Sequence, residues 1–299
     1  MVDFDDVYVQ PNGEMLHQGK SQAMRNKFEH DFNDFERSTD KIHFQDLDAA
    51  LAGDSNNRVE FLKKYWGRET YDKLIGLVKK QTKKLEYDST KVSALVDDYL
   101  KREIKKIRHT DNHLKKLRNR KFKDIPKVDA GYDEQVKDAA DWIIGASNSK
   151  TKSPGWDAEI ESLLYSYAKS SEPINLTELE KIKTKLKLDA PERVLLAHND
   201  ASYGASATGK ILLEKHLGDV ERLLLIKSAN GGVDPNWHAR QMLGGIIGAH
   251  AFGDANGRLG RIAYAVILLR AKNFSKLPKS EEDALHGITT RYRRESSWK

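Results

Sequence analysis

The residues best suited to chemistry gather in one stretch, HAFGDANGRLGR, which runs from His250 to Arg261. It contains one histidine, the side chain that ordinarily accepts a proton near neutral pH and so serves as a general base. Asp254 is a hard oxygen ligand, and beside phosphates such a carboxylate usually holds Mg²⁺. Arg258 and Arg261 are three residues apart, so on a helix both project from one side and can bind phosphate oxygens. The stretch therefore predicts proton transfer beside a phosphate site.

Two apolar helical patterns must position these residues. The first is NWHARQMLGGIIGAHAF and the second is RLGRIAYAVILLRAKN, which is apolar enough to be central in the core. Gly253, Gly257 and Gly260 allow tight turns and close approach between the helices. Backbone N–H groups at the start of the second helix, with the helix dipole behind them, form an anion site suited to phosphate. Together these features predict a nucleotide-polyphosphate cradle next to a general base, and phosphoryl-type transfer needs little else from a protein.

The pattern His-x-Phe-x-Asp-x-Asn-Gly-Arg-x-x-Arg resembles the signature of Fic-domain (Fido) proteins. The resemblance continues in AADWIIGASNSK and in the late ALHGI, and it covers about residues 134–290. It is strongest toward the AMP-transferring Fic proteins that bacteria inject as type III effectors. This resemblance implies a mainly α fold, a Fic-fold helical bundle with a small β-hairpin flap and an N-terminal helical extension.

Fic proteins of this kind transfer AMP from ATP to a hydroxyl in the switch I loop of host Rho-family GTPases. The resemblance therefore implies a protein adenylyltransferase that uses ATP and Mg²⁺, and a target protein, a Rho-family small GTPase, modified on Ser, Thr or Tyr. It implies that His250 deprotonates the target hydroxyl and that Asp254 holds the Mg²⁺. It implies that Asn256 and Gly257 contact the α-phosphate and that Arg258 and Arg261 contact the outer phosphates. It also implies that Phe252 points into the core as a structural residue.

Two positions depart from the commonest Fic pattern, with Ala251 in place of proline and Ala255 where glycine often occurs. Neither carries a reacting group. The family's hairpin flap pairs with the target peptide as an added strand, and RVLLAHNDASYG, residues 193–204, is the candidate for it. The chain contains no Ser/Thr-x-x-x-Glu-Gly/Asn string, the motif of the self-inhibiting helix of many Fic proteins. We therefore expect an open active site unless another polypeptide closes it.

Two alternatives remain open at this point. A Fic enzyme could use another donor, such as UTP or CDP-choline, or act on a bacterial target. A non-catalytic module could bind anionic lipid or nucleic acid through a basic segment. GASATGKI, residues 204–211, comes one residue short of a P-loop, since Ile211 replaces the Ser or Thr that would bind Mg²⁺, and we interpret it as an accidental match.

Charge divides the chain unevenly. Residues 1–60 hold thirteen acids and six bases, whereas residues 101–127 hold twelve bases and three acids. Such a basic helical face can meet anionic lipid, nucleic acid or an acidic protein, or it can be simply solvated. The run ends at a Pro, an Asp and a Gly before a new amphipathic pattern begins. We therefore predict a charged N-terminal helical arm over 1–127, acidic and then basic, and a Fic catalytic domain over 128–299.

Composition restricts the remaining possibilities. The chain has 299 residues, 38% apolar and 32% charged, and no cysteine, so any metal must be held by oxygen or nitrogen. Apolar residues at three- and four-residue spacing predict helices over 132–149, 157–170 and 175–186, with Asn175 as a cap and Asp234-Pro235 at the entry of a further helix. No apolar run is long enough for a membrane span, and the start, MVDFDDVY, does not resemble a signal peptide. We expect a protein injected into the host cytosol without a cleaved signal peptide.

Overall fold

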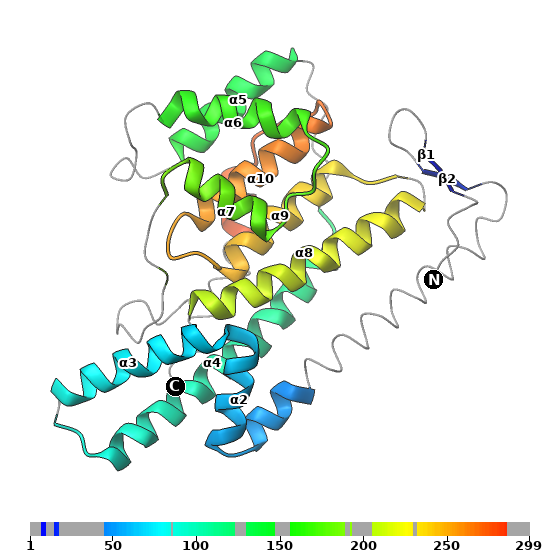
Figure 1. Ribbon diagram of the computed structural model, residues 1–299. Helices are drawn as coiled ribbons and strands as arrows, with labels where there is room; N and C mark the ends of the chain where they lie inside the picture. The colour runs from blue at the N-terminus through cyan, green and yellow to red at the C-terminus, as the bar shows by residue number, and fades with distance from the viewer. Residues whose placement is uncertain are drawn as a thin grey trace.

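The protein is described by a computed structural model that is mainly α-helical (Figure 1). It describes residues 7–9, 15–17, 45–84, 86–122, 130–146, 156–188, 192, 205–229 and 232–285. Residues 45–52 and 279–285 are also helical. The elements with assigned bounds are β1 Val7–Val9, β2 Met15–His17, α2 Ser55–Trp66, α3 Arg68–Lys84, α4 Ser89–Arg118, α5 Tyr132–Gly145, α6 Trp156–Lys169, α7 Leu176–Lys185, α8 Ser206–Ala229, α9 Pro235–Ala249 and α10 Asn256–Arg270.

Helix starts follow the capping residues in the sequence. The side chain of Asn175 accepts a hydrogen bond from the backbone N–H of Glu178 at 3.0 Å. Asp234 accepts one from the N–H of Asn236 at 2.9 Å, and Pro235 occupies the first position of α9. Such caps satisfy backbone donors that a helix leaves unpaired at its start, typically worth about 1 kcal/mol each. Both predicted helix starts are therefore confirmed.

The centre of the molecule is the antiparallel pair α9 and α10 (Figure 1). Helices α5, α6 and α7 pack on α10, while α4 and α8 pack on α9. The pair approaches closely at Gly260, where an added Cβ would lie 2.9 Å from Leu243 Cδ1 and 3.3 Å from the Leu243 carbonyl oxygen. Because both helices are buried nearly all round, their connecting turn is held from several sides.

The N-terminal helices share this hydrophobic core. Leu62, Leu74 and Leu100 belong to the same cluster of buried side chains as Ile246 and Tyr264. A buried hydrogen bond joins α9 to the end of α4, since Gln241 Nε2 donates to the Leu117 carbonyl at 2.9 Å. The proposed boundary at residue 127 lies outside the described residues, and the division into an arm and a catalytic domain stays a prediction.

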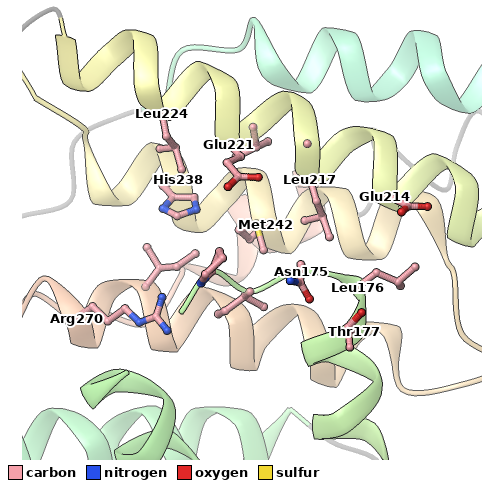
Figure 2. A pocket seen from close by; sticks show the side chains of 15 residues that line it. Asn175, Leu176, Thr177, Glu214, Leu217, Glu221, Leu224, His238, Met242 and Arg270 are labelled. Atoms are coloured by element: carbon pink, nitrogen blue, oxygen red, sulfur yellow. The ribbon is translucent and has the colours of Figure 1, made fainter. Parts of the chain in front are cut away.

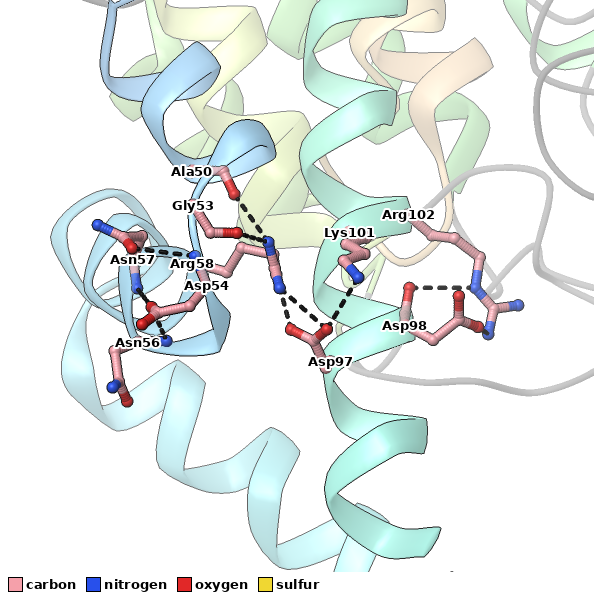
Figure 3. A network of polar contacts seen from close by, with 10 residues as sticks. All are labelled: Ala50, Gly53, Asp54, Asn56, Asn57, Arg58, Asp97, Asp98, Lys101 and Arg102. Carbon is pink, nitrogen blue, oxygen red and sulfur yellow. Dashed lines mark hydrogen bonds and ion pairs between the residues drawn. The ribbon is translucent and has the colours of Figure 1, made fainter. Parts of the chain in front are cut away.

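The basic segment 101–127 is described as far as residue 122, and most of it lies in α4. Figure 3 shows where the segment begins in α4, with Arg58 and Lys101 converging on Asp97 and Arg102 bonding to Asp98. The hydrogen bond from Arg58 is the main cause that lowers the pKa of Asp97. Further ion pairs along the helix join Lys106 to Glu103, Arg108 to Asp48, Lys115 to Asp111 and Arg118 to Asp219. Much of the basic charge is thus neutralised within the fold, which gives the suggested anionic lipid partner no support.

Strands are short in the described residues. β1 and β2 form an antiparallel hairpin with Val7 opposite His17. The predicted flap at residues 193–204 lies outside the described residues, so this hairpin is a different one. No helix among the described residues has both the length and the apolarity to cross a bilayer.

Two histidines, the buried His216 and the partly buried His238, predict a loss of stability in acid. Burial lowers the pKa of His216 to about 4, with Arg118 and Lys215 acting in the same direction and the Gln241 carbonyl and Asp111 opposing. Burial, with Arg270 nearby, also lowers the pKa of His238 to about 4. Below pH 6.5, the ordinary pKa of histidine, the unfolded chain binds protons at these side chains and the folded chain does not. The free energy of unfolding therefore decreases as the pH is lowered from 6.5 to about 4.

Urea denaturation at pH 7.5 and pH 5 measures this loss, which we expect to be about 2 kcal/mol at pH 5 for His216 alone. The ring Nε2 of His216 lies 3.1 Å from the Gln241 carbonyl oxygen, so His216→Gln keeps a donor at this site without the titration. This variant should have a flatter pH dependence. An unchanged dependence would remove His216 as the cause.

Candidate active site

The predicted chemical residues lie in the turn that joins α9 to α10. His250 is the C-terminal cap of α9, with φ 51° and ψ 49°, and its N–H donates to the Ile246 carbonyl at 3.1 Å. Ala255, the N-terminal cap of α10, is also left-handed at φ 70°. Left-handed backbone is unfavourable for residues with a Cβ, costing roughly 1 kcal/mol or more, and it persists where the surroundings impose it. From the sequence, we expected the glycines of the motif to form its tight backbone turns. In the structure, the residues of the turn with left-handed backbone are His250 and Ala255.

Asn256 holds the turn together. Its side-chain oxygen accepts from the Phe252 N–H at 3.0 Å, and its Nδ2 donates to the Phe252 carbonyl at 2.8 Å. Both residues are buried, with the Phe252 ring only 1% exposed. The Asn256 amide retains a second donor and a second acceptor position beyond these two bonds. Its first effect is therefore to close the loop from Phe252 to Asn256, which carries Asp254.

The first turn of α10 brings Asp254 and Arg258 together. Arg258 Nη2 lies 2.9 Å from Asp254 Oδ2, and the Asp254 side chain is 56% exposed. The pair is half-exposed, since the Asp254 carboxylate is exposed while the Arg258 side chain is buried, so the carboxylate is accessible to a cation. No group of three or more potential His, Asp or Glu ligands for a metal occurs in the described part of the chain. A single exposed carboxylate nevertheless fits Mg²⁺ that arrives on a nucleotide, because Mg²⁺ is commonly bound by one or two carboxylates plus substrate phosphates.

Arg261 is held differently, by a buried acid from the last helical turn. Its Nε donates to Glu282 Oε1 at 2.8 Å and its Nη2 donates to the same oxygen. Its Nη1 lies on the side of Gly257, where an added Cβ would be 3.5 Å away. The neighbouring Glu281 pairs at 2.7 Å with the fully buried Arg240 of α9. The sequence pattern contained no local sign of Glu282, because the pairing joins positions twenty-one residues apart.

The start of α8 contains the string that resembles a P-loop, and a buried carboxylate occupies it. Glu103 of α4 is 1% exposed and accepts from the Ala205 N–H at 3.1 Å and from the Thr208 hydroxyl at 3.2 Å. Trp66 Nε1 donates to the Thr208 hydroxyl at 2.9 Å. A helix start that already holds an anionic side chain repels phosphate. The interpretation of GASATGKI as an accidental match therefore agrees with the structure.

A separate cavity of about 330 Å³ lies between α7, α8, α9 and α10 (Figure 2). His238, from the start of α9, and Arg270, from the end of α10, line it beside Met242 and Glu221. These ends of the two helices are opposite the ends that meet at the motif. Arg270 donates to the carbonyls of Tyr167 and Glu172, so its side chain ties the end of α6 to α10. The cavity is therefore distinct from the turn that carries the predicted chemistry.

A helical bundle centred on two antiparallel helices, joined by this motif, defines the Fic fold. The chain superposes on the crystal structure of the Fic-domain-containing AMPylator VopS with a TM-score of 0.58 and 22% identity, covering 81% of this chain and 80% of that chain. A crystal structure of IbpAFic2 aligns at a TM-score of 0.47 and 15% identity, covering 81% of this chain and 92% of that one. No protein-family model matches.

In sequence, the chain is similar to protein adenylyltransferase VopS of Vibrio parahaemolyticus serotype O3:K6. The two are 34% identical over 163 residues, which is 53% of this chain and 39% of that protein. The chain thus matches well under half the length of this curated relative. The predicted mainly α Fic fold and the resemblance to Fic-domain proteins are confirmed.

Proposed function

We propose that the chain is a protein adenylyltransferase, which transfers AMP from ATP to a protein hydroxyl. The observation that carries the proposal is the complete His-x-Phe-x-Asp-x-Asn-Gly-Arg-x-x-Arg pattern in the α9–α10 turn of a Fic fold. The name of the relative VopS, a protein adenylyltransferase, supports the same activity.

In the proposed reaction the target hydroxyl attacks the α-phosphorus of ATP. A new P–O bond forms to the target, the bond between the α-phosphorus and the pyrophosphate oxygen breaks, and pyrophosphate leaves. His250 takes the hydroxyl proton onto its imidazole as general base. The residue His250 is partly exposed at the end of α9, which suits contact with a protein substrate.

The remaining motif residues would hold the triphosphate. Backbone N–H groups at the start of α10, at Asn256 and Gly257, offer donors to the α-phosphate. Arg258 can exchange its exposed partner Asp254 for phosphate oxygens, while Arg261 keeps its buried partner and offers Nη1 beside Gly257. Asp254 would then hold Mg²⁺, which supplies neutralisation of the phosphate charge. Both arginines are buried, and they differ in their acidic partner, which is the exposed Asp254 for Arg258 and the buried Glu282 for Arg261.

For the target, we propose a Ser, Thr or Tyr hydroxyl of a Rho-family GTPase, modified inside a host cell by an injected bacterial effector. The support is the sequence similarity to VopS, which extends over 163 residues. An enzyme that modifies proteins must admit a protein loop to the α-phosphate, and the motif turn lies at one end of α9 and α10 rather than in mid-helix.

Intact protein mass tests the donor and the target together. The enzyme is incubated with Mg²⁺, a Rho-family GTPase and either ATP, UTP or CDP-choline, and we expect the GTPase to gain the mass of one AMP with ATP only. A gain of UMP or phosphocholine would overturn ATP as the donor. If the GTPase stays unmodified but labelled AMP enters proteins of host or bacterial lysate, the target proposal fails and the activity stands.

The same assay separates an enzyme from a binding module. Absence of any modified product, together with salt-sensitive binding to anionic lipid or nucleic acid that survives loss of His250, would favour the module and overturn the proposed activity.

A further inference from the structure

Gly209 lies in the first turn of α8, directly against the turn that carries His250. A Cβ added at this glycine would lie 2.6 Å from the Ala249 carbonyl oxygen, 2.8 Å from Ala251 Cα and 2.9 Å from the His250 carbonyl oxygen. All three are backbone atoms, so none can rotate out of the way. By contrast, a Cβ at Gly244 would meet only the flexible side-chain end of Leu117, at 2.7 Å.

The first turn of α8 is itself firmly fixed. Glu103 accepts from the Ala205 N–H and the Thr208 hydroxyl, and Trp66 donates to the same hydroxyl. Lys106 pairs with the other oxygen of Glu103 at 2.8 Å. These residues are buried or nearly so. Buried, mutually satisfied polar groups of this kind rigidify the backbone that carries them.

The rigid first turn of α8 affects the backbone conformation at His250. Its left-handed conformation is one that a residue with a Cβ holds only when neighbouring structure imposes it. On the α8 side, Gly209 lies close to the backbone from residue 249 to residue 251. The position of the imidazole therefore depends on how closely α8 approaches the turn.

We propose that Gly209 is a positioning residue for His250, and that the glycine-rich string at the start of α8 serves this contact. The inference rests on the proposed role of His250 as general base. Gly209 touches no reacting atom and acts through the backbone of the turn. Because the three atoms nearest to an added Cβ belong to residues 249 to 251 and not to α10, nucleotide binding should depend on Gly209 much less than turnover.

The test compares Gly209→Ala with Gly218→Ala in the same helix, where an added Cβ would meet nothing within 4 Å. A displacement of the order of 1 Å can cost about a hundredfold in rate, so we expect Gly209→Ala to lower kcat by about tenfold to a hundredfold. The affinity for ATP, measured by calorimetry, should stay within about threefold, as expected of a change that spares the phosphate donors. Gly218→Ala should match the parent in both. Full kcat in Gly209→Ala would overturn the inference.

A readout independent of turnover is the nuclear magnetic resonance signal of the His250 ring. Its chemical shifts should change in Gly209→Ala and stay unchanged in Gly218→Ala and Gly244→Ala. Unchanged ring shifts in folded Gly209→Ala would refute the positioning role even if no substrate were known. If His250→Ala loses AMP transfer and Gly209→Ala keeps it in full, only this inference is wrong. If His250→Ala still transfers AMP, the proposed function is wrong.

A second variant covers the case in which Gly209→Ala does not fold. Thr208→Val removes the hydroxyl that joins Trp66 to Glu103 and so loosens the same turn, whereas Thr208→Ser keeps it. We expect a lower kcat with retained ATP affinity in Thr208→Val and recovery in Thr208→Ser. Equal kcat in the two variants would contradict the inference.

Discussion

Replacing His250 with alanine is expected to abolish AMP transfer while ATP binding persists. Removal of a general base costs about 10² to 10⁴-fold in rate. Nucleotide binding should survive, because the proposed phosphate donors belong to α10 and begin at Asn256, beyond the turn. The measurements are AMP incorporation into the target and calorimetric titration with ATP and Mg²⁺.

The control is His250→Asn. Because His250 is left-handed, alanine there introduces a backbone cost, whereas asparagine tolerates this conformation better than most residues. Both variants lack a base of suitable pKa, so both should lose turnover, and Asn should keep more of the parent's thermal stability. A variant of either kind that retained most of its turnover would refute the role of His250.

The local parts of the fold could be predicted from the sequence. Asn175 and Asp234 cap helices where their spacing to the following apolar residues indicated, because capping depends on atoms two or three residues away. The motif connects two core helices because apolar residues on both sides repeat at helical spacing. Short-range periodicity therefore located the site.

The partners of the site's charged groups could not be predicted in this way. Glu282 reaches Arg261 from a later helical turn, and Glu103 reaches the start of α8 from about a hundred residues earlier. In the basic segment, Arg108 and Arg118 pair with Asp48 and Asp219. Such pairings are decided by how helices pack, and they leave no periodic pattern in the sequence. The sequence left open whether the run of bases forms a binding face or a solvated one, and in the structure it is partly buried and partly paired with acids.

Replacing Arg261 with alanine should damage both stability and nucleotide binding. Glu282 is buried, and removal of the guanidinium breaks its buried ion pair with Arg261, a change that typically costs about 3 to 5 kcal/mol. Loss of a charge-assisted hydrogen bond to phosphate costs a further 1.5 to 3 kcal/mol of binding, roughly tenfold to a hundredfold in ATP affinity. Urea denaturation and calorimetric titration measure the two effects separately.

The double variant Arg261→Ala/Glu282→Gln separates the two roles of this arginine. A neutral amide is far less costly to leave buried than a carboxylate, so the double variant should regain a large part of the lost stability. Its ATP affinity should stay low, because the guanidinium is still absent. Recovery of ATP affinity along with stability would mean that Arg261 only holds the last helical turn in place. Unchanged affinity in the single variant would likewise exclude Arg261 from the phosphate site.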